Sequence, residues 1–128
     1  MNKDSNALNW FEIPAADINR AKTFYSKVFN ADMVDMGEQM GMKMVGFPAD
    51  MNNGHVSGSL VQGPNHKPSA DGAVVYLNAN PSIQAVIDRI EPAGGKVVVP
   101  RTEISPEIGV MAFFIDSEGN RVALHAQN

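Results

Sequence analysis

The chain has 128 residues, 44% of them hydrophobic and 19% charged, which fits one compact domain and is too short for two independent cores. Its net charge of −4, with ten scattered basic residues, gives no electrostatic footprint for nucleic acid or an anionic membrane. It has no cysteine, no signal-peptide pattern and no apolar run long enough to span a membrane, so we expect a cytoplasmic protein without disulfides or thiolate chemistry.

The first half of the chain begins with a strand that leads into a helix. Residues 10–14 alternate between two faces, the period of a half-buried strand. Asp17 can cap the helix that follows, because apolar residues recur at three- and four-residue spacing from Ile18 to Phe29. Three further strands are predicted at residues 31–36, 42–47 and 56–61. The first half therefore reads βαβββ.

The second half repeats this order after a connector at residues 62–72, QGPNHKPSADG, whose prolines and glycines cannot continue a sheet. Asn80 and Pro81 predict the start of a helix, with proline at the first helical position, and Gly94 and Gly95 predict its end. Strands are predicted around this helix at residues 74–77, 96–99, 110–115 and 121–125.

Equivalent positions in the two halves have nearly constant separation. Trp10 corresponds to Val74, 64 residues later, whereas the hairpin glycines Gly54 and Gly119 are separated by 65. A drift of one residue is what a loop insertion gives. The two halves are therefore interpreted as two copies of one structural unit.

Four sequence segments are distinctive: FEIPAADINRAKTFYSKVF, DGAVVYLNAN, EPAGGKVVVP and FFIDSEGNRVALH. Together with βαβββ units at about residues 8–61 and 73–126, they resemble the vicinal oxygen chelate superfamily of glyoxalases, bleomycin-resistance proteins and extradiol dioxygenases. The resemblance covers residues 9–126. It implies a single α+β domain, residues 1–128, in which curved mixed sheets surround a cavity and the helices lie outside. Because open sheets can bury each other's edges, we also expect a homodimer.

Metal-using members of this superfamily place a ligand on the first and last strand of each unit. The resemblance and the repeat put these four positions at Trp10, Gly58, Val74 and Ala123. Divalent metals need imidazole, carboxylate, thiolate or carbonyl donors, which these side chains do not offer. We therefore predict no metal and no cofactor.

Residues that share a strand face with these positions are candidates for lining the cavity. They are Trp10, Glu12, Tyr76, Asn78, Arg121 and His125. Residues of opposite parity are expected to face the helices: Phe11, Ile13, Val75, Leu77, Val122 and Leu124. If Glu12 converges with His125, the two could form a general acid/base pair. Alternatively, Glu12 is satisfied by backbone groups or Arg121, and His125 is solvated near the chain end.

Other residues admit two interpretations. His55 and His66 are expected to be surface loop residues, with metal ligation as the alternative. The methionines of MVDMGEQMGMKM either fill the core or form an adaptable apolar surface. Trp10 either floors a ligand pocket or fills it. The connector and the segment PRTEISPEIG either rim the cavity or form solvated turns.

The sequence favours a metal-independent protein that binds a small molecule. The alternative is a glyoxalase-like lyase or isomerase whose metal is held by residues not identified above. A module that binds a partner through the methionine-rich segment is a third possibility, since fold alone does not decide activity.

Overall fold

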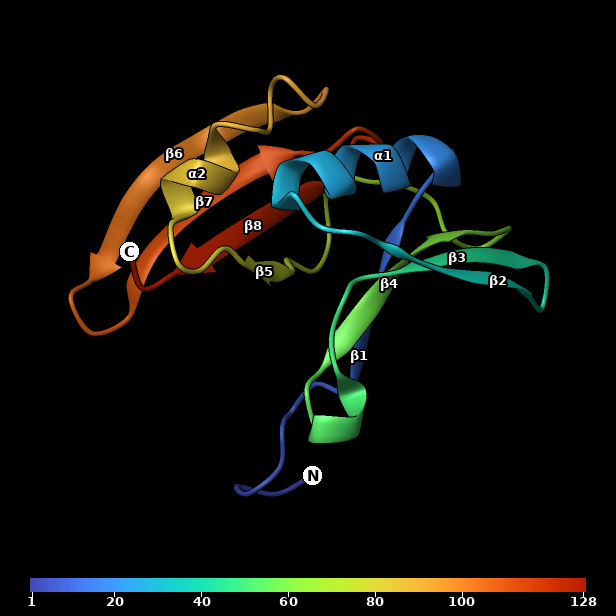
Figure 1. The fold of residues 1–128 in the computed structure, drawn as a ribbon, viewed down its shortest axis with the longest axis horizontal. Coiled ribbons are helices and arrows are strands. Elements are labelled where there is room, and N and C mark those ends of the chain that lie inside the picture. Colours follow the sequence, from blue (N-terminus) through green and yellow to red (C-terminus); the bar gives the residue numbers. More distant parts are fainter.

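Two four-stranded sheets, each lying against a helix on one face, make up the chain (Figure 1). The computed structural model describes residues 1–128. In both sheets the first strand of the unit pairs in parallel with the fourth, and the remaining strands pair antiparallel. This arrangement confirms the predicted α+β class with its two mixed sheets.

The strand order is the same in the two sheets. The first sheet, β1-β4-β3-β2, contains β1 (Trp10–Pro14), β2 (Val34–Gln39), β3 (Met42–Gly46) and β4 (Ser57–Gln62). The second, β5-β8-β7-β6, contains β5 (Tyr76–Asn78), β6 (Lys96–Ser105), β7 (Gly109–Ile115) and β8 (Arg121–Ala126). A short 3-10 turn, η1 (Met51–Asn53), precedes β4.

The first helix, α1 (Ile18–Phe29), begins where the sequence predicts. The carboxylate of Asp17 accepts hydrogen bonds from the backbone N–H groups of Asn19 and Arg20, which the first turn of a helix leaves without partners. The helix ends at Asn30, whose backbone is left-handed. The predicted cap is therefore confirmed. At 12 residues, α1 is the longer of the two helices, and neither is long and apolar enough to cross a membrane.

The second helix, α2 (Ile83–Ile87), starts later than predicted and has five residues. Its cap is Ser82, whose hydroxyl accepts from the N–H of Ala85, so Pro81 precedes the helix instead of opening it. The prediction that this helix ends at Gly94 and Gly95 was also wrong, because α2 ends at Ile87 and the chain continues in turns.

Strand β6 also differs from the prediction, since it continues beyond Val99 to Ser105. The predicted strand ended at residue 99, just before Pro100, which cannot donate to a ladder. However, β6 is an edge strand, and the register shifts between Val99 and Thr102, where the proline needs no partner.

The predicted division of the strands into two faces is confirmed on the helix side. All six residues expected there lie in the hydrophobic core or pack against it: Phe11, Ile13, Val75, Leu77, Val122 and Leu124. The core is one cluster that contains residues of both units. Within it, the ring of Tyr25 on α1 contacts Phe47 of the first unit at 5.4 Å between centroids and Phe114 of β7 at 6.4 Å. Helix α1 is therefore the shared element between the two sheets.

The turn between β7 and β8 holds the start of α1 through Glu118. Its Oε1 accepts from the backbone N–H groups of Ala16 and Asp17 at 2.9 and 2.8 Å, and its Oε2 accepts from Nε of Arg20 at 2.7 Å. The Glu118 side chain is only 1% exposed. The second unit thus supplies an anion to the first turn of the first unit's helix, where the positive end of the helix dipole favours it.

The same turn reaches the core through Asp116. Its Oδ2 accepts from the buried hydroxyl of Tyr25 at 2.7 Å, while its Oδ1 accepts from the backbone N–H groups of Glu118 and Asn120. Asn120 in turn donates from Nδ2 to the carbonyl of Pro14 at 2.7 Å. We call this set of contacts the interunit lock, consisting of Glu118, Asp116 and Asn120 against the corner between β1 and α1.

The environment of Glu118 lowers its pKa. Burial by itself raises the pKa. The hydrogen bonds from Arg20, the Asp17 N–H and the Ser117 hydroxyl, with the charge of Arg20, together lower it by more than burial raises it, so that the pKa lies below its ordinary value of 4.5. Because the pKa of Glu118 is lower in the folded than in the unfolded protein, its ionised form stabilises the fold. This stabilisation is complete above the pKa of the unfolded state and is lost as the pH falls through the pKa of the folded state.

We therefore expect Glu118→Gln to destabilise the protein at pH 7 by about 1–2 kcal/mol, because the amide offers the lock one weaker acceptor and no charge. Thermal unfolding followed by circular dichroism should show a melting temperature lower by roughly 4–8 °C. The difference from the unmodified protein should shrink as the pH is lowered from about 5, since protonated Glu118 resembles glutamine. Glu91→Gln, at an exposed carboxylate without a hydrogen-bond partner, is the matched control. A difference that stays constant down to acidic pH would contradict this role of the Glu118 charge.

Candidate functional site

The six cavity candidates lie on strand faces away from the helices but are divided between the two sheets. The first-sheet face carries Trp10 and Glu12 of β1, with Ser59 and Val61 of β4 and three methionines beside them: Met36, Met42 and Met44. The second-sheet face carries the other four candidates and their strand neighbours: Tyr76, Asn78, Met111, Phe113, Arg121, Ala123 and His125.

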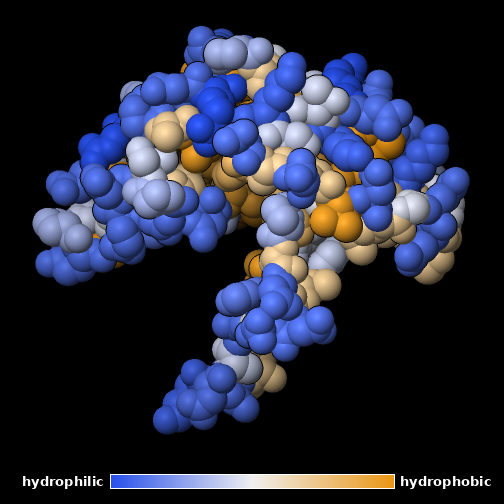
Figure 2. Space-filling model, viewed as in Figure 1, coloured by the Kyte–Doolittle hydropathy of each residue, from blue (hydrophilic) through white to orange (hydrophobic).

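These two faces do not close on each other within the chain. The sheets diverge from the shared core, and the space-filling view shows an open notch between them, with apolar side chains near its apex (Figure 2). Separate pockets of about 480 and 470 Å³ lie one beside each sheet, and they share no lining residue. The structure therefore brings Tyr76, Asn78 and His125 together, but it places Glu12 on the other sheet.

The second-sheet face carries an aromatic platform with a cation on it, formed by Tyr76, Phe113 and Arg121. The rings of Tyr76 and Phe113 meet edge to face at 5.7 Å, and Cζ of Arg121 lies 4.1 Å from the centroid of Phe113. Arg121 forms no ion pair in the chain, and Tyr76 is 52% exposed. An exposed aromatic ring beside an unpaired guanidinium can stack against a flat apolar molecule and pair with an anionic group on it.

Polar groups border the platform in the 470 Å³ pocket. Nε2 of His125 lies 2.7 Å from the carbonyl of Ile108, which can only accept, so Nε2 carries the proton and Nδ1 of a neutral ring is left as an acceptor. Oδ1 of Asn78 accepts from the N–H and Nδ2 of Asn80, which leaves Nδ2 of Asn78 as a donor. The pocket therefore offers one acceptor and one donor next to apolar side chains.

Glu12 has an imidazole partner, but it is His66 and not His125. Oε1 of Glu12 lies 2.8 Å from Nε2 of His66, whose side chain is 20% exposed. His66 was expected to be a surface loop residue, and no spacing signal could have paired it with a residue 54 positions earlier. The one sequence feature that could have placed His66 near Glu12 was the interpretation of the connector as a segment that rims the cavity.

Two polar atoms beside this pair have no hydrogen-bond partner in the chain. They are Oγ of the fully buried Ser59 and Nδ1 of His66. Ser59 lies directly opposite Glu12 in the β1–β4 pairing, so its hydroxyl is on the first-sheet face. Buried polar groups without partners are costly, and in native proteins they often mark places where another molecule completes the hydrogen bond.

The structure corrects one of the four positions assigned to metal ligands. Gly58 pairs with Phe11 and faces the helices, where an added Cβ would collide with the Phe11 ring, whereas Ser59 occupies the position equivalent to Ala123. The reason is that equivalent strand residues of the two units are separated by 64 positions, and only the hairpin glycines are separated by 65.

With this correction, the metal-ligand positions of the superfamily hold Trp10, Ser59, Val74 and Ala123. A single neutral hydroxyl cannot hold a divalent metal, and no group of three or more histidine, aspartate or glutamate side chains in the chain could do so. The residues present at these positions therefore do not fit a metal.

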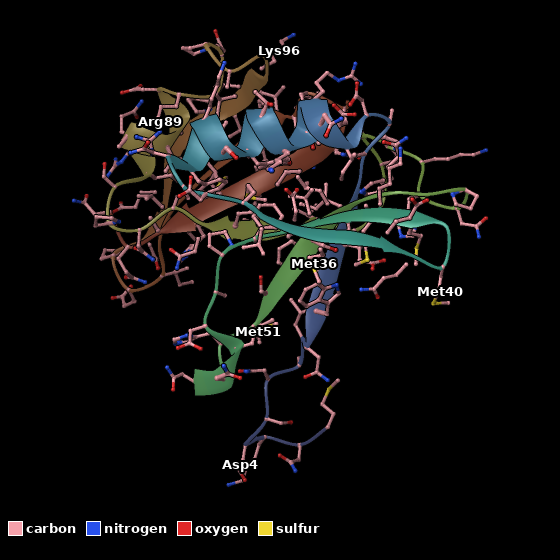
Figure 3. The ribbon with its side chains drawn as sticks, turned by 45° about the vertical axis from the view of Figure 1, so that its right-hand side comes forward. Asp4, Met36, Met40, Met51, Arg89 and Lys96 are labelled. Carbon is pink, nitrogen blue, oxygen red and sulfur yellow. The ribbon has the colours of Figure 1, made fainter.

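The methionine-rich segment contributes four methionines to the surface and one to the core. Met36, Met42 and Met44 are half-buried on the first-sheet face, with Met36 lying over Gly46, and Met40 at the β2–β3 turn is almost fully exposed (Figure 3). Only Met33, which precedes β2, belongs to the hydrophobic cluster. Flexible thioether side chains on an open face suit a surface that adapts to its ligand.

Comparison with known proteins agrees with this architecture. Residues 7–124 match the Glyoxalase/Bleomycin resistance protein/Dioxygenase superfamily. A glyoxylase-like domain-containing protein of Didymella fabae is 31% identical over 123 residues, 91% of this chain and 91% of that protein. A Mycobacterium tuberculosis protein provisionally named glyoxylase CFP32 is 27% identical over 122 residues, 94% of this chain but 45% of the relative, so the chain spans less than half of that protein.

A solved structure shows the same fold at low sequence identity. It is a glyoxalase/bleomycin resistance protein/dioxygenase family enzyme from Burkholderia phytofirmans PsJN, 13% identical, with a TM-score of 0.67 over 94% of this chain and 98% of that one. Since the family match covers nearly the whole sequence and the two repeated sheets have the expected order, the chain belongs to the glyoxalase/bleomycin resistance protein/dioxygenase superfamily.

Proposed function

We propose that the protein binds a small, flat, largely apolar molecule with an anionic group, without using a metal. The observation that carries the proposal is the platform on the second-sheet face, where Tyr76 is 52% exposed and Arg121 lies over the buried ring of Phe113. The Tyr76 ring supplies stacking area and Arg121 supplies an unpaired positive charge. Asn78 and His125 at the border supply a donor and an acceptor that orient the ligand.

We further propose that a second copy of the chain closes the site, as a homodimer. The first-sheet face carries Trp10 and half-buried methionines that keep part of their surface exposed, although His66 of the connector lies against Glu12 there. Strands β1 and β5 are edge strands, and each has unpaired backbone groups along its outer side. A two-fold axis would place the first-sheet face of one copy opposite the second-sheet face of the other and bury both edges.

A glyoxalase-like lyase or isomerase is the second candidate. It is supported by the names of the Didymella fabae and Mycobacterium tuberculosis relatives. It would require metal ligands from outside the four equivalent positions, because those positions hold Trp10, Ser59, Val74 and Ala123. A cytoplasmic location also remains a prediction.

The ligand class can be tested with anilinonaphthalene sulfonate (ANS), a fluorescent aromatic anion. We expect ANS fluorescence to rise on binding and Tyr76→Ala or Arg121→Gln to weaken binding about five- to tenfold, because one ring or one charge contact is worth roughly 1 to 1.4 kcal/mol. Lys96→Gln removes an exposed charge of β6 as the control. Circular dichroism must show that the variants remain folded. Equal ANS affinity in all four proteins would contradict the proposed site.

The assembly can be tested by light scattering coupled to size-exclusion chromatography. We expect a particle of twice the chain mass of 13.8 kDa. Trp10→Asp should shift it toward the monomer, because a carboxylate would be buried on the closing face. Met40→Asp, at the exposed hairpin tip, should leave the dimer intact. A protein that stays monomeric at about 100 μM, well above the Kd of a stable dimer, would argue against closure by a second copy.

Metal analysis separates the two candidate functions. We expect the purified protein to contain zinc, nickel, iron and manganese far below one equivalent per chain, because the ligand positions lack donors. Treatment with a chelator should leave ANS binding unchanged. One equivalent of metal, with a turnover that chelation abolishes, would favour the lyase or isomerase.

A further inference from the structure

A second pocket, which we call the connector pocket, lies away from the platform. It has a volume of about 480 Å³ and is bordered by the corner after β1, the start of β3 and the residues that follow β4. It is lined by Lys43, Gln62, His66 and Lys67, with small residues and prolines between them. None of these residues lines the pocket beside the platform.

The polar side chains of the connector pocket are hydrogen-bond donors with free capacity. The ammonium groups of Lys43 and Lys67 make no ion pair in the chain, although Glu38 lies across from Lys43 on β2. Oε1 of Gln62 accepts from the backbone N–H of Ile18 at 2.9 Å, which fixes the amide and leaves Nε2 to donate elsewhere.

His66 adds a further polar atom. Its Nε2 donates to Oε1 of Glu12 at 2.8 Å, so the buried Nδ1 of the neutral ring is an acceptor without a partner in the chain, available to a hydroxyl or protonated oxygen of a ligand and not to the anionic oxygens. No carboxylate lines the pocket, and two of those close to its lining residues are already engaged: Glu12 with His66, and Glu118 with Arg20 and the N–H of Ala16. A pocket with two unpaired ammonium groups, a fixed amide and no acidic lining stands out in a chain whose net charge is −4.

We infer that the connector pocket binds a small oxyanion, the phosphate or carboxylate group of a small molecule. Charge-assisted hydrogen bonds from ammonium groups to such oxyanions are roughly twice as strong as hydrogen bonds between neutral groups. The volume lies in the range of small-molecule sites and exceeds what an inorganic ion alone would fill. This site does not depend on the platform, so it can exist whether or not the proposed function is correct.

The test is a titration of ¹⁵N-labelled protein with inorganic phosphate and, separately, with succinate, at constant ionic strength. We expect saturable amide shifts confined to residues 15–16, 41–43 and 62–68, with a Kd of about 1 mM, typical of a site held by a few charge contacts. Tighter binding of phosphate would indicate a phosphate ester as the natural ligand, and tighter binding of succinate a carboxylate; either result supports the inference.

The double variant Lys43→Gln/Lys67→Gln should weaken binding at least tenfold. Lys3→Gln/Lys96→Gln removes the same charge elsewhere on the chain and should leave the affinity within about twofold, a difference close to the precision of such titrations. The amide spectra themselves report whether each variant is folded. Absence of saturable shifts for both anions, shifts spread over the whole surface, or equal weakening by the control pair would overturn the inference.

Discussion

The interunit lock determines how this molecule can work. Glu118 and Asp116, in the hairpin turn of the second unit, hold the first turn and the core side of α1 in the first unit. Helix α1 covers the first sheet and also packs against Phe114 of the second. By holding α1, the lock therefore keeps the helix-covered faces of both sheets directed at one shared core. The opposite faces must then point apart, so a single chain presents two separate faces instead of one enclosed cavity.

The lock is polar, but it lies at the border of an apolar core, and this makes it sensitive to change. Tyr25 is fully buried, and burial together with the charge of Asp116 raises its pKa well above the ordinary value, so its hydroxyl keeps its proton and donates to Asp116. Asp116 is itself satisfied by three further N–H groups, from Glu118 and from the backbone and side chain of Asn120. Removal of one member of such a network leaves the others buried without partners, which costs more than the lost hydrogen bond alone.

Local features of the fold could be predicted from the sequence, whereas contacts between distant segments could not. Strand β1, the Asp17 cap and the parity of the strand faces follow from short-range periodicity, and four of the six site candidates do share the second-sheet face. The prediction of Gly58 instead of Ser59 as a metal-ligand position was wrong because the separation of 65 between the hairpin glycines was applied to the last strands, which keep a separation of 64. The pairing of Glu12 with His66 and the contact of Glu118 with Arg20 join residues 54 and 98 positions apart, which leaves no pattern in the sequence. The open arrangement of the sheets depends on such contacts between distant segments.

The central claim is that each complete site combines the first-sheet face of one copy with the second-sheet face of another. Refolding a mixture of Trp10→Ala and Tyr76→Ala chains, each of which we expect to bind ANS more weakly when alone, tests it directly. A mixed dimer would then contain one site with both changes and one site with neither, so high-affinity ANS binding should return in the mixture. If the mixture binds no more than the average of its two parents, the two faces do not meet across chains and the account is wrong.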